Sequence, residues 1–136
     1  ALMGEAMVLV NPALWDYFRT SMKQNGSILA KGWLLGLQFY TLFKDNLYFT
    51  LAQKANAQAQ RIQKAFLDKG IPLLVNSPTN QQFVIVTTAQ AAQLQKEVIC
   101  EPEGPVDDGH LCLRLCTSWS TTDEEVEAVL EAIRAL

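Results

Sequence analysis

The sequence predicts an α+β fold in which an antiparallel sheet of three to four strands is packed by helices. Two apolar runs, at 71–75 and 81–86, are separated only by the turn sequence NSPTN, which favours an antiparallel hairpin. A further run with alternating side chains follows at 111–119, and amphipathic helices are predicted before and after these strands. The first forty or so residues fit this unit poorly, and we expect there a strand and two apolar helices.

The N-terminal elements are predicted from local signals. The apolar run Glu5 to Val10 reads as a strand that ends at Asn11-Pro12, where an Asn cap and a Pro at the first helical position predict a helix over 12–24. The run 27–43 carries Lys31 as its only formal charge and is slightly short for a membrane span. We therefore expect a helix that is buried on most sides, at a subunit or domain interface.

The remaining helices follow from spacing and capping residues. A long helix is predicted over 47–69 and ends at Gly70, with a solvated face rich in Gln and Lys opposite its apolar stripe. A shorter helix follows the Thr pair at 87–88, and 99–110 supplies a short strand and an acidic loop. The closing helix is predicted to start at a capping box, formed either by Thr121 with Glu124 or by Thr122 with Glu125.

Composition excludes several classes of function. A formal net charge of −3 argues against binding to a nucleic-acid backbone, which requires clustered Lys and Arg. Three cysteines without a CxxC pair and a single His110 predict reduced thiols and no metal site.

The hydrophobic share of 49% and the charged share of only 18% suggest that apolar surface meets another domain or subunit, with a homo-oligomer expected. No signal peptide opens the chain, so we expect a cytoplasmic protein without a membrane span, cut from a longer polypeptide.

The strand LCLRLCTSW, at 111–119, carries Arg114 in its middle. Because side chains alternate along a strand, Arg114 lies on the face opposite the leucines, between two cysteines. A guanidinium cannot lose its proton, and its removal from water without a partner is costly. Arg114 must therefore reach solvent, pair with a nearby carboxylate such as Asp107, Asp108 or Glu101, or bind an anionic ligand.

Several stretches resemble a known family. The runs LAKGWLLGLQFYTLF, SPTNQQF, GPVDDGH and RLCTSWSTTDEEV, in this order, are similar to the C-terminal part of the beta-eliminating lyase and low-specificity threonine aldolase family. These are pyridoxal-phosphate enzymes of fold type I. The resemblance implies that residues 1–44 are the tail of the large cofactor-binding domain, a strand plus two helices, and that 45–136 form the small C-terminal domain.

The resemblance also assigns roles to two basic residues. Similar enzymes use the arginine of the strand before the final helix to hold the α-carboxylate of the amino-acid substrate, which implies this role for Arg114. A planar guanidinium suits it because it binds both carboxylate oxygens. Lys31 lies near the place where relatives have a basic residue that meets the cofactor phosphate of the neighbouring subunit. The alternative for Lys31 is a lysine that reaches water from the end of an apolar helix.

The implied function is that of a lyase whose chemistry lies outside this chain. The Schiff-base lysine of similar proteins would fall just upstream of Ala1, so no catalytic residue is expected within the chain, and the chain alone is expected to be inactive and to bind no cofactor. The parent enzyme would cleave a β-hydroxy amino acid to glycine and an aldehyde. The family histidine that stacks on the cofactor belongs upstream, so no role is carried over to His110. The alternative is a non-enzymatic α+β domain that binds a small organic anion or mediates assembly.

Overall fold

The structure, a computed structural model, describes residues 3–136. The chain divides into two compact units, of which the first reaches Tyr48 and the second runs from Phe49 to Leu136.

The first unit contains only short helices. They are the 3-10 helices η1 (Pro12–Leu14) and η2 (Lys44–Asn46) and the α-helices α1 (Phe18–Gln24) and α2 (Trp33–Phe43). The Asn11 side chain caps η1 as expected, accepting a hydrogen bond from the Ala13 N–H at 3.0 Å. The helix predicted over 12–24 is interrupted, because Tyr17 has a left-handed backbone with φ 58°. Short helices are marginal without tertiary packing, which this segment does not obtain here.

The strand predicted at Glu5–Val10 is absent from the structure, in which residues 4–11 carry no regular secondary structure. A strand needs a neighbour for its backbone N–H and C=O groups. The described residues of the first unit contain no second strand that could supply one.

The apolar run at 27–43 also differs from expectation. Its helix, α2, starts only at Trp33, and its large side chains are exposed rather than buried: Trp33 is 65% exposed, Leu37 52% and Tyr40 64%. None of the described residues of the first unit is buried. The unit therefore has no hydrophobic core of its own. Among residues 3–136, no helix combines the length and the apolar character that crossing a membrane requires.

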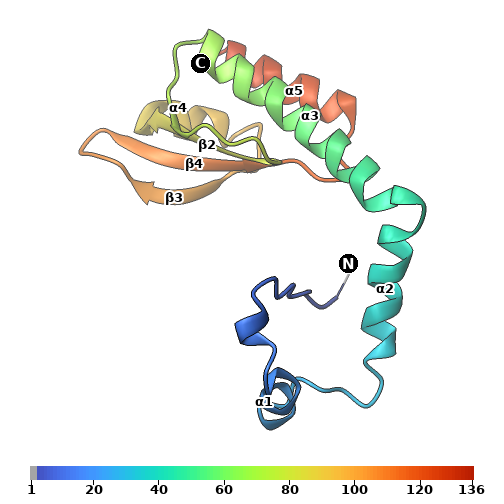
Figure 1. The fold of residues 1–136 in the computed structure, drawn as a ribbon. Coiled ribbons are helices and arrows are strands. Elements are labelled where there is room, and N and C mark those ends of the chain that lie inside the picture. The colour runs from blue at the N-terminus through green and yellow to red at the C-terminus, as the bar shows by residue number, and fades with distance from the viewer. Residues whose placement is uncertain (1–2) are drawn as a thin grey trace. The chain divides into compact units, whose positions relative to one another are not determined.

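The second unit is built on a four-stranded antiparallel sheet with the strand order β1-β2-β4-β3 (Figure 1). Its strands are β1 (Leu73–Val75), β2 (Gln81–Thr87), β3 (Glu101–Pro105) and β4 (His110–Cys116). β4 is a central strand, because β2 and β3 pair with it on either side.

Three helices cover one face of this sheet: α3 (Leu47–Asp68), α4 (Thr88–Leu94) and α5 (Asp123–Arg134). Figure 1 shows α3 and α5 side by side above the strands. The core between helices and sheet contains Phe66 of α3, Val84 of β2, Leu113 of β4 and Val126 of α5, all fully buried. The prediction of an α+β fold with helices on one face of an antiparallel sheet is confirmed.

The glutamine-rich face of α3 is not fully solvated, contrary to the sequence prediction. Gln63 is 7% exposed, and its amide nitrogen donates to Gln82 Oε1 at 2.7 Å and to the Ser77 carbonyl at 3.0 Å. Gln82 lies on β2 and donates in turn to the Thr79 carbonyl at 2.9 Å. These bonds satisfy buried polar groups and attach the β1–β2 turn to the helix.

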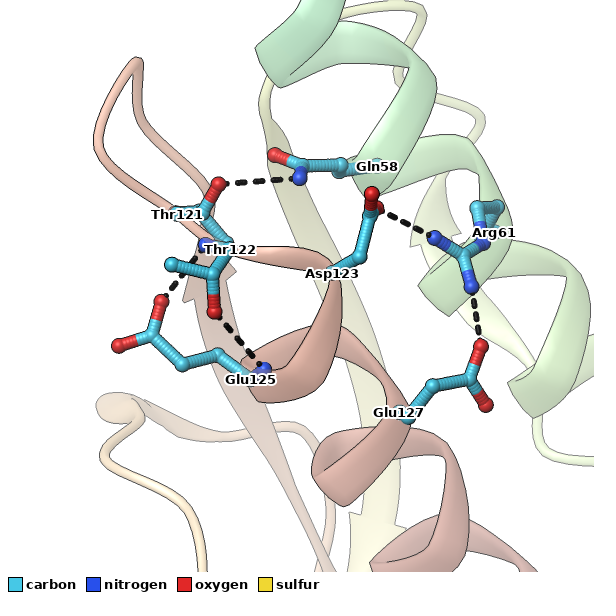
Figure 2. Close-up of polar contacts among 7 residues, drawn as sticks. All are labelled: Gln58, Arg61, Thr121, Thr122, Asp123, Glu125 and Glu127. Carbon is cyan, nitrogen blue, oxygen red and sulfur yellow. Dashed lines mark hydrogen bonds and ion pairs between the residues drawn. The ribbon is translucent and has the colours of Figure 1, made fainter.

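The start of α5 is fixed by the second of the two predicted capping boxes. Thr122 Oγ1 accepts from the Glu125 N–H at 3.2 Å, and the Glu125 carboxylate accepts from the Thr122 N–H at 2.8 Å (Figure 2). Just before the cap, the Thr121 carbonyl accepts from Gln58 of α3 at 3.0 Å. The Thr122 N–H and the Thr121 carbonyl are thereby both hydrogen-bonded.

Arg61 joins α3 to α5 through charge. As Figure 2 shows, its guanidinium reaches Asp123 Oδ1 at 3.1 Å and also pairs with Glu127. The Arg61 side chain is 40% exposed. Such exposed ion pairs contribute little to stability, about 0–1 kcal/mol.

The exposed side chains of α2 predict that the chain self-associates in solution. Replacing Trp33 and Leu37 together with Ser should shift the sedimentation profile toward the monomer, because association is driven by burial of apolar surface. Ile99→Ser is the matched control, since Ile99 is a 96% exposed apolar residue of the second unit. A clean monomer of the unaltered chain at high concentration would contradict this prediction.

The buried glutamine network predicts a second effect. Gln63→Leu leaves the Gln82 side-chain carbonyl without its donor, so the free energy of unfolding should fall by about 1–3 kcal/mol in urea titrations. Gln53→Leu is the control, because Gln53 is an exposed glutamine of the same helix. Equal midpoints for the two variants would show that the network does not stabilise the fold.

Candidate functional site

Arg114 lies in the middle of β4, on the sheet face that the helices leave open. Its neighbours along the strand, Leu113 and Leu115, are buried against the helices, so alternation places Arg114 on the opposite face. The register of the sheet sets Arg114 opposite Phe83 of β2 and Glu101 of β3. The Arg114 side chain is 35% exposed, which leaves part of the guanidinium in solvent.

Arg114 forms an ion pair with Glu103, with 3.0 Å between Nη1 and Oε1. The partners predicted from the sequence were Glu101, Asp107 and Asp108, and this prediction was wrong. β3 is irregular at this point, and its register with β4 shifts between Pro102 and Gly104. Glu103 is the extra residue of this bulge, and Gly104 has φ 125°, a backbone conformation that favours glycine.

The ion pair uses only part of the guanidinium. Arg114 Nε is buried and has no hydrogen-bond partner among residues 3–136. Within the ion pair, Nη1 approaches Glu103 to 3.0 Å, and no hydrogen bond between the two side chains accompanies this contact in the described part of the chain. The half-buried Phe83 and Ile85 share this face and offer no acceptor side chain. Arg114 therefore retains capacity for an anionic group.

Glu103 is the site residue that was not predicted from the sequence. A usable signal was alternation along the strand sequence EPEGP, which sets Glu103 on the same face as Glu101. The glycine in this sequence is also typical of a bulge. A bulge changes which side chain of a strand reaches the neighbouring one.

Lys31 belongs to the first unit, whereas Arg114 belongs to the second. Lys31 lies in the turn just before α2 and is exposed, and its side chain makes no ion pair with any residue of the described chain. Its ammonium group is therefore accessible to an anion, as it would be in the alternative of a lysine that simply reaches water.

His110 is the first residue of β4, and it closes the turn from β3. Its Nδ1 lies 2.8 Å from Asp107 Oδ1, and the same carboxylate accepts from the Gly109 N–H at 2.8 Å. The Gly109 backbone bond, followed by the His110 side chain, lowers the pKa of Asp107. Both side chains are exposed, as expected for the acidic loop predicted within 99–110.

The cysteines are free thiols, of which Cys100 and Cys112 are buried and Cys116 is exposed. Burial raises the pKa of the Cys112 thiol, and the charge of Glu103 raises it further. Cys112 is the neighbour of Arg114 on the same sheet face, so Glu103 acts on both residues.

One pocket of the second unit can be compared with the residues that the sequence assigns to a pyridoxal-phosphate site. Such a site needs a lysine for the aldehyde, a cation for the phosphate and contacts to the ring. A shallow pocket of the second unit lies at one end of the sheet, where Lys69, Ile85 and His110 contribute to its lining, and it contains neither Arg114 nor Lys31. Lys69 donates to the Arg134 carbonyl there and is already engaged.

The chain resembles a solved threonine aldolase over nearly its whole length. The threonine aldolase of Leishmania major is 37% identical over 93% of this chain, with a TM-score of 0.83, and this chain covers 37% of that one. A serine palmitoyltransferase of Sphingomonas wittichii is 23% identical, with 58% of this chain and 22% of that chain covered and a TM-score of 0.48. A lysine aminotransferase of M. tuberculosis is 16% identical, with 71% and 22% covered and a TM-score of 0.47.

The last two similarities are too weak to add to the assignment. No family model matches the chain, and no curated protein sequence matches it. The identity to the Leishmania enzyme and the agreement of fold nevertheless point to one group of proteins. The chain belongs to the threonine aldolase family of fold type I pyridoxal-phosphate enzymes, and it corresponds to the C-terminal part of such a protein.

Proposed function

We propose that the chain is the C-terminal part of a pyridoxal-phosphate lyase of the threonine aldolase type, in which Arg114 binds the α-carboxylate of the substrate. The reaction is the retro-aldol cleavage of a β-hydroxy amino acid to glycine and an aldehyde. The observation that carries the proposal is an arginine with unused donors on the open face of a sheet, in a chain 37% identical to a threonine aldolase.

The role of Arg114 follows from its charge and its shape. The guanidinium stays protonated and offers several N–H donors in one plane, which suits the two oxygens of a carboxylate. Bound pyridoxal phosphate supplies the electron sink for cleavage of the bond between Cα and Cβ. This chain contributes orientation. When the α-carboxylate of the substrate is held in one place, the bond of Cα that is broken is determined.

The exposed apolar side chains of the first unit support its assignment to a larger domain. We propose that residues 1–44 are the tail of the large cofactor-binding domain and 45–136 the small domain. The exposed Trp33 and Leu37 would pack against residues outside this chain, in the large domain or in a second subunit of a homo-oligomer. Lys31 would meet the phosphate of the cofactor in the neighbouring subunit.

The proposal predicts the behaviour of two Arg114 variants in the full-length protein. Arg114→Ala removes charge-assisted bonds of roughly 1.5–3 kcal/mol, so kcat/KM for threonine should fall by about one to three decades. The cofactor absorbance should be retained. Arg114→Lys keeps the charge and loses the planar fork, so it should recover only part of the activity.

Arg61→Ala is the matched control, because Arg61 is another ion-paired arginine of the same unit. It should lower the melting temperature slightly and leave kcat/KM unchanged. Near-normal kcat/KM in Arg114→Ala would refute the carboxylate role. A loss of melting temperature without loss of activity per folded molecule would make Arg114 a structural ion-pair member.

A further inference from the structure

The ion pair of Arg114 forms beside an irregularity in the backbone of β3. Glu101 is the residue of β3 that the register sets opposite Arg114, yet the pair forms with Glu103, two residues further along the strand. Glu103 stands at the bulge of β3, next to Gly104 with its positive φ. Bulges of this kind change the direction of a side chain and are common beside functional sites.

The pair contributes little as a stabilising contact. The side chains of Glu103 and Arg114 are 36% and 35% exposed, and ion pairs in such positions are weakened by solvent. Their geometry yields no hydrogen bond, and Arg114 Nε stays unpartnered within the described chain. A contribution to the stability of the fold therefore does not explain why Glu103 pairs with Arg114.

A long arginine side chain loses conformational freedom when it binds a ligand, and this loss weakens binding. A carboxylate beside one nitrogen reduces the loss, because its charge favours the rotamers that keep the guanidinium next to Glu103. Glu103 approaches the guanidinium at Nη1 and Nε has no partner within the described chain, so donors remain for a second anion. The disadvantage is a weaker attraction for the anion, since Glu103 partly neutralises the charge of the guanidinium.

We infer that Glu103 is a positioning residue, which holds Nη1 of Arg114 so that the rest of the guanidinium is ready for the substrate carboxylate. This inference rests on the proposed function of Arg114. Glu103 itself touches neither substrate nor cofactor in this account.

The test is steady-state kinetics of the full-length holoenzyme with threonine. Glu103→Ala should raise KM roughly three- to tenfold, the range expected when one long side chain must be ordered on binding, with kcat changed less than KM. Glu103→Gln keeps the length and an acceptor oxygen, so it should lie between Glu103→Ala and the unaltered enzyme. Glu101→Gln is the matched control, because it removes the same charge from the same strand, and it should leave KM unchanged.

Two results would overturn the inference. A fall of KM in Glu103→Ala and Glu103→Gln would show that Glu103 competes with the substrate for Arg114. An unchanged KM in both would show that Arg114 needs no positioning. If Glu103→Ala fails to fold, the nearly isosteric Glu103→Gln still decides between these outcomes, with melting temperature recorded for each variant.

Arg114→Ala separates this inference from the proposed function. If Arg114→Ala has normal kcat/KM, the carboxylate role fails, and Glu103 has nothing to position. If Arg114→Ala is impaired while the Glu103 variants behave like the unaltered enzyme, only the inference fails. In the Arg114→Ala background, Glu103→Ala should have no further effect on kcat/KM, because the two residues act as one unit. Additive losses would contradict the inference.

Discussion

A permanently charged guanidinium in a central, mostly apolar strand is the constraint on which the rest of the site depends. Arg114 cannot lose its proton, so burial without a partner would be costly. The fold meets this constraint by placing all three helices of the second unit on the other face of the sheet. Arg114 then faces the open side, where one carboxylate and solvent share its charge.

Hydrophobic periodicity and capping residues made most of the second unit predictable from the sequence. The long helix, the final helix with its Thr122 capping box and the hairpin around 76–80 all follow from local signals that agree with the tertiary fold. Gln63 was misassigned because its burial depends on Gln82, a partner on another element. Glu103 was missed for a related reason, since its pairing with Arg114 depends on how β3 lies along β4.

The first unit departs from prediction in a physically consistent way. A strand at 5–10 and a buried helix at 27–43 both require partners, and the described residues of this unit supply neither. The sequence patterns are those of elements packed in a larger body. The helices of this unit are short and interrupted, and the large apolar side chains of α2 are exposed.

Binding of glycine and of glycinamide to the full-length protein tests the central claim most directly, because the two ligands differ in the carboxylate. If Arg114 binds that group, Arg114→Ala should weaken glycine binding by about a decade or more in calorimetric titrations and leave glycinamide binding unchanged. Equal losses for both ligands, or an unchanged affinity for glycine, would contradict the assignment of Arg114 as the carboxylate-binding residue.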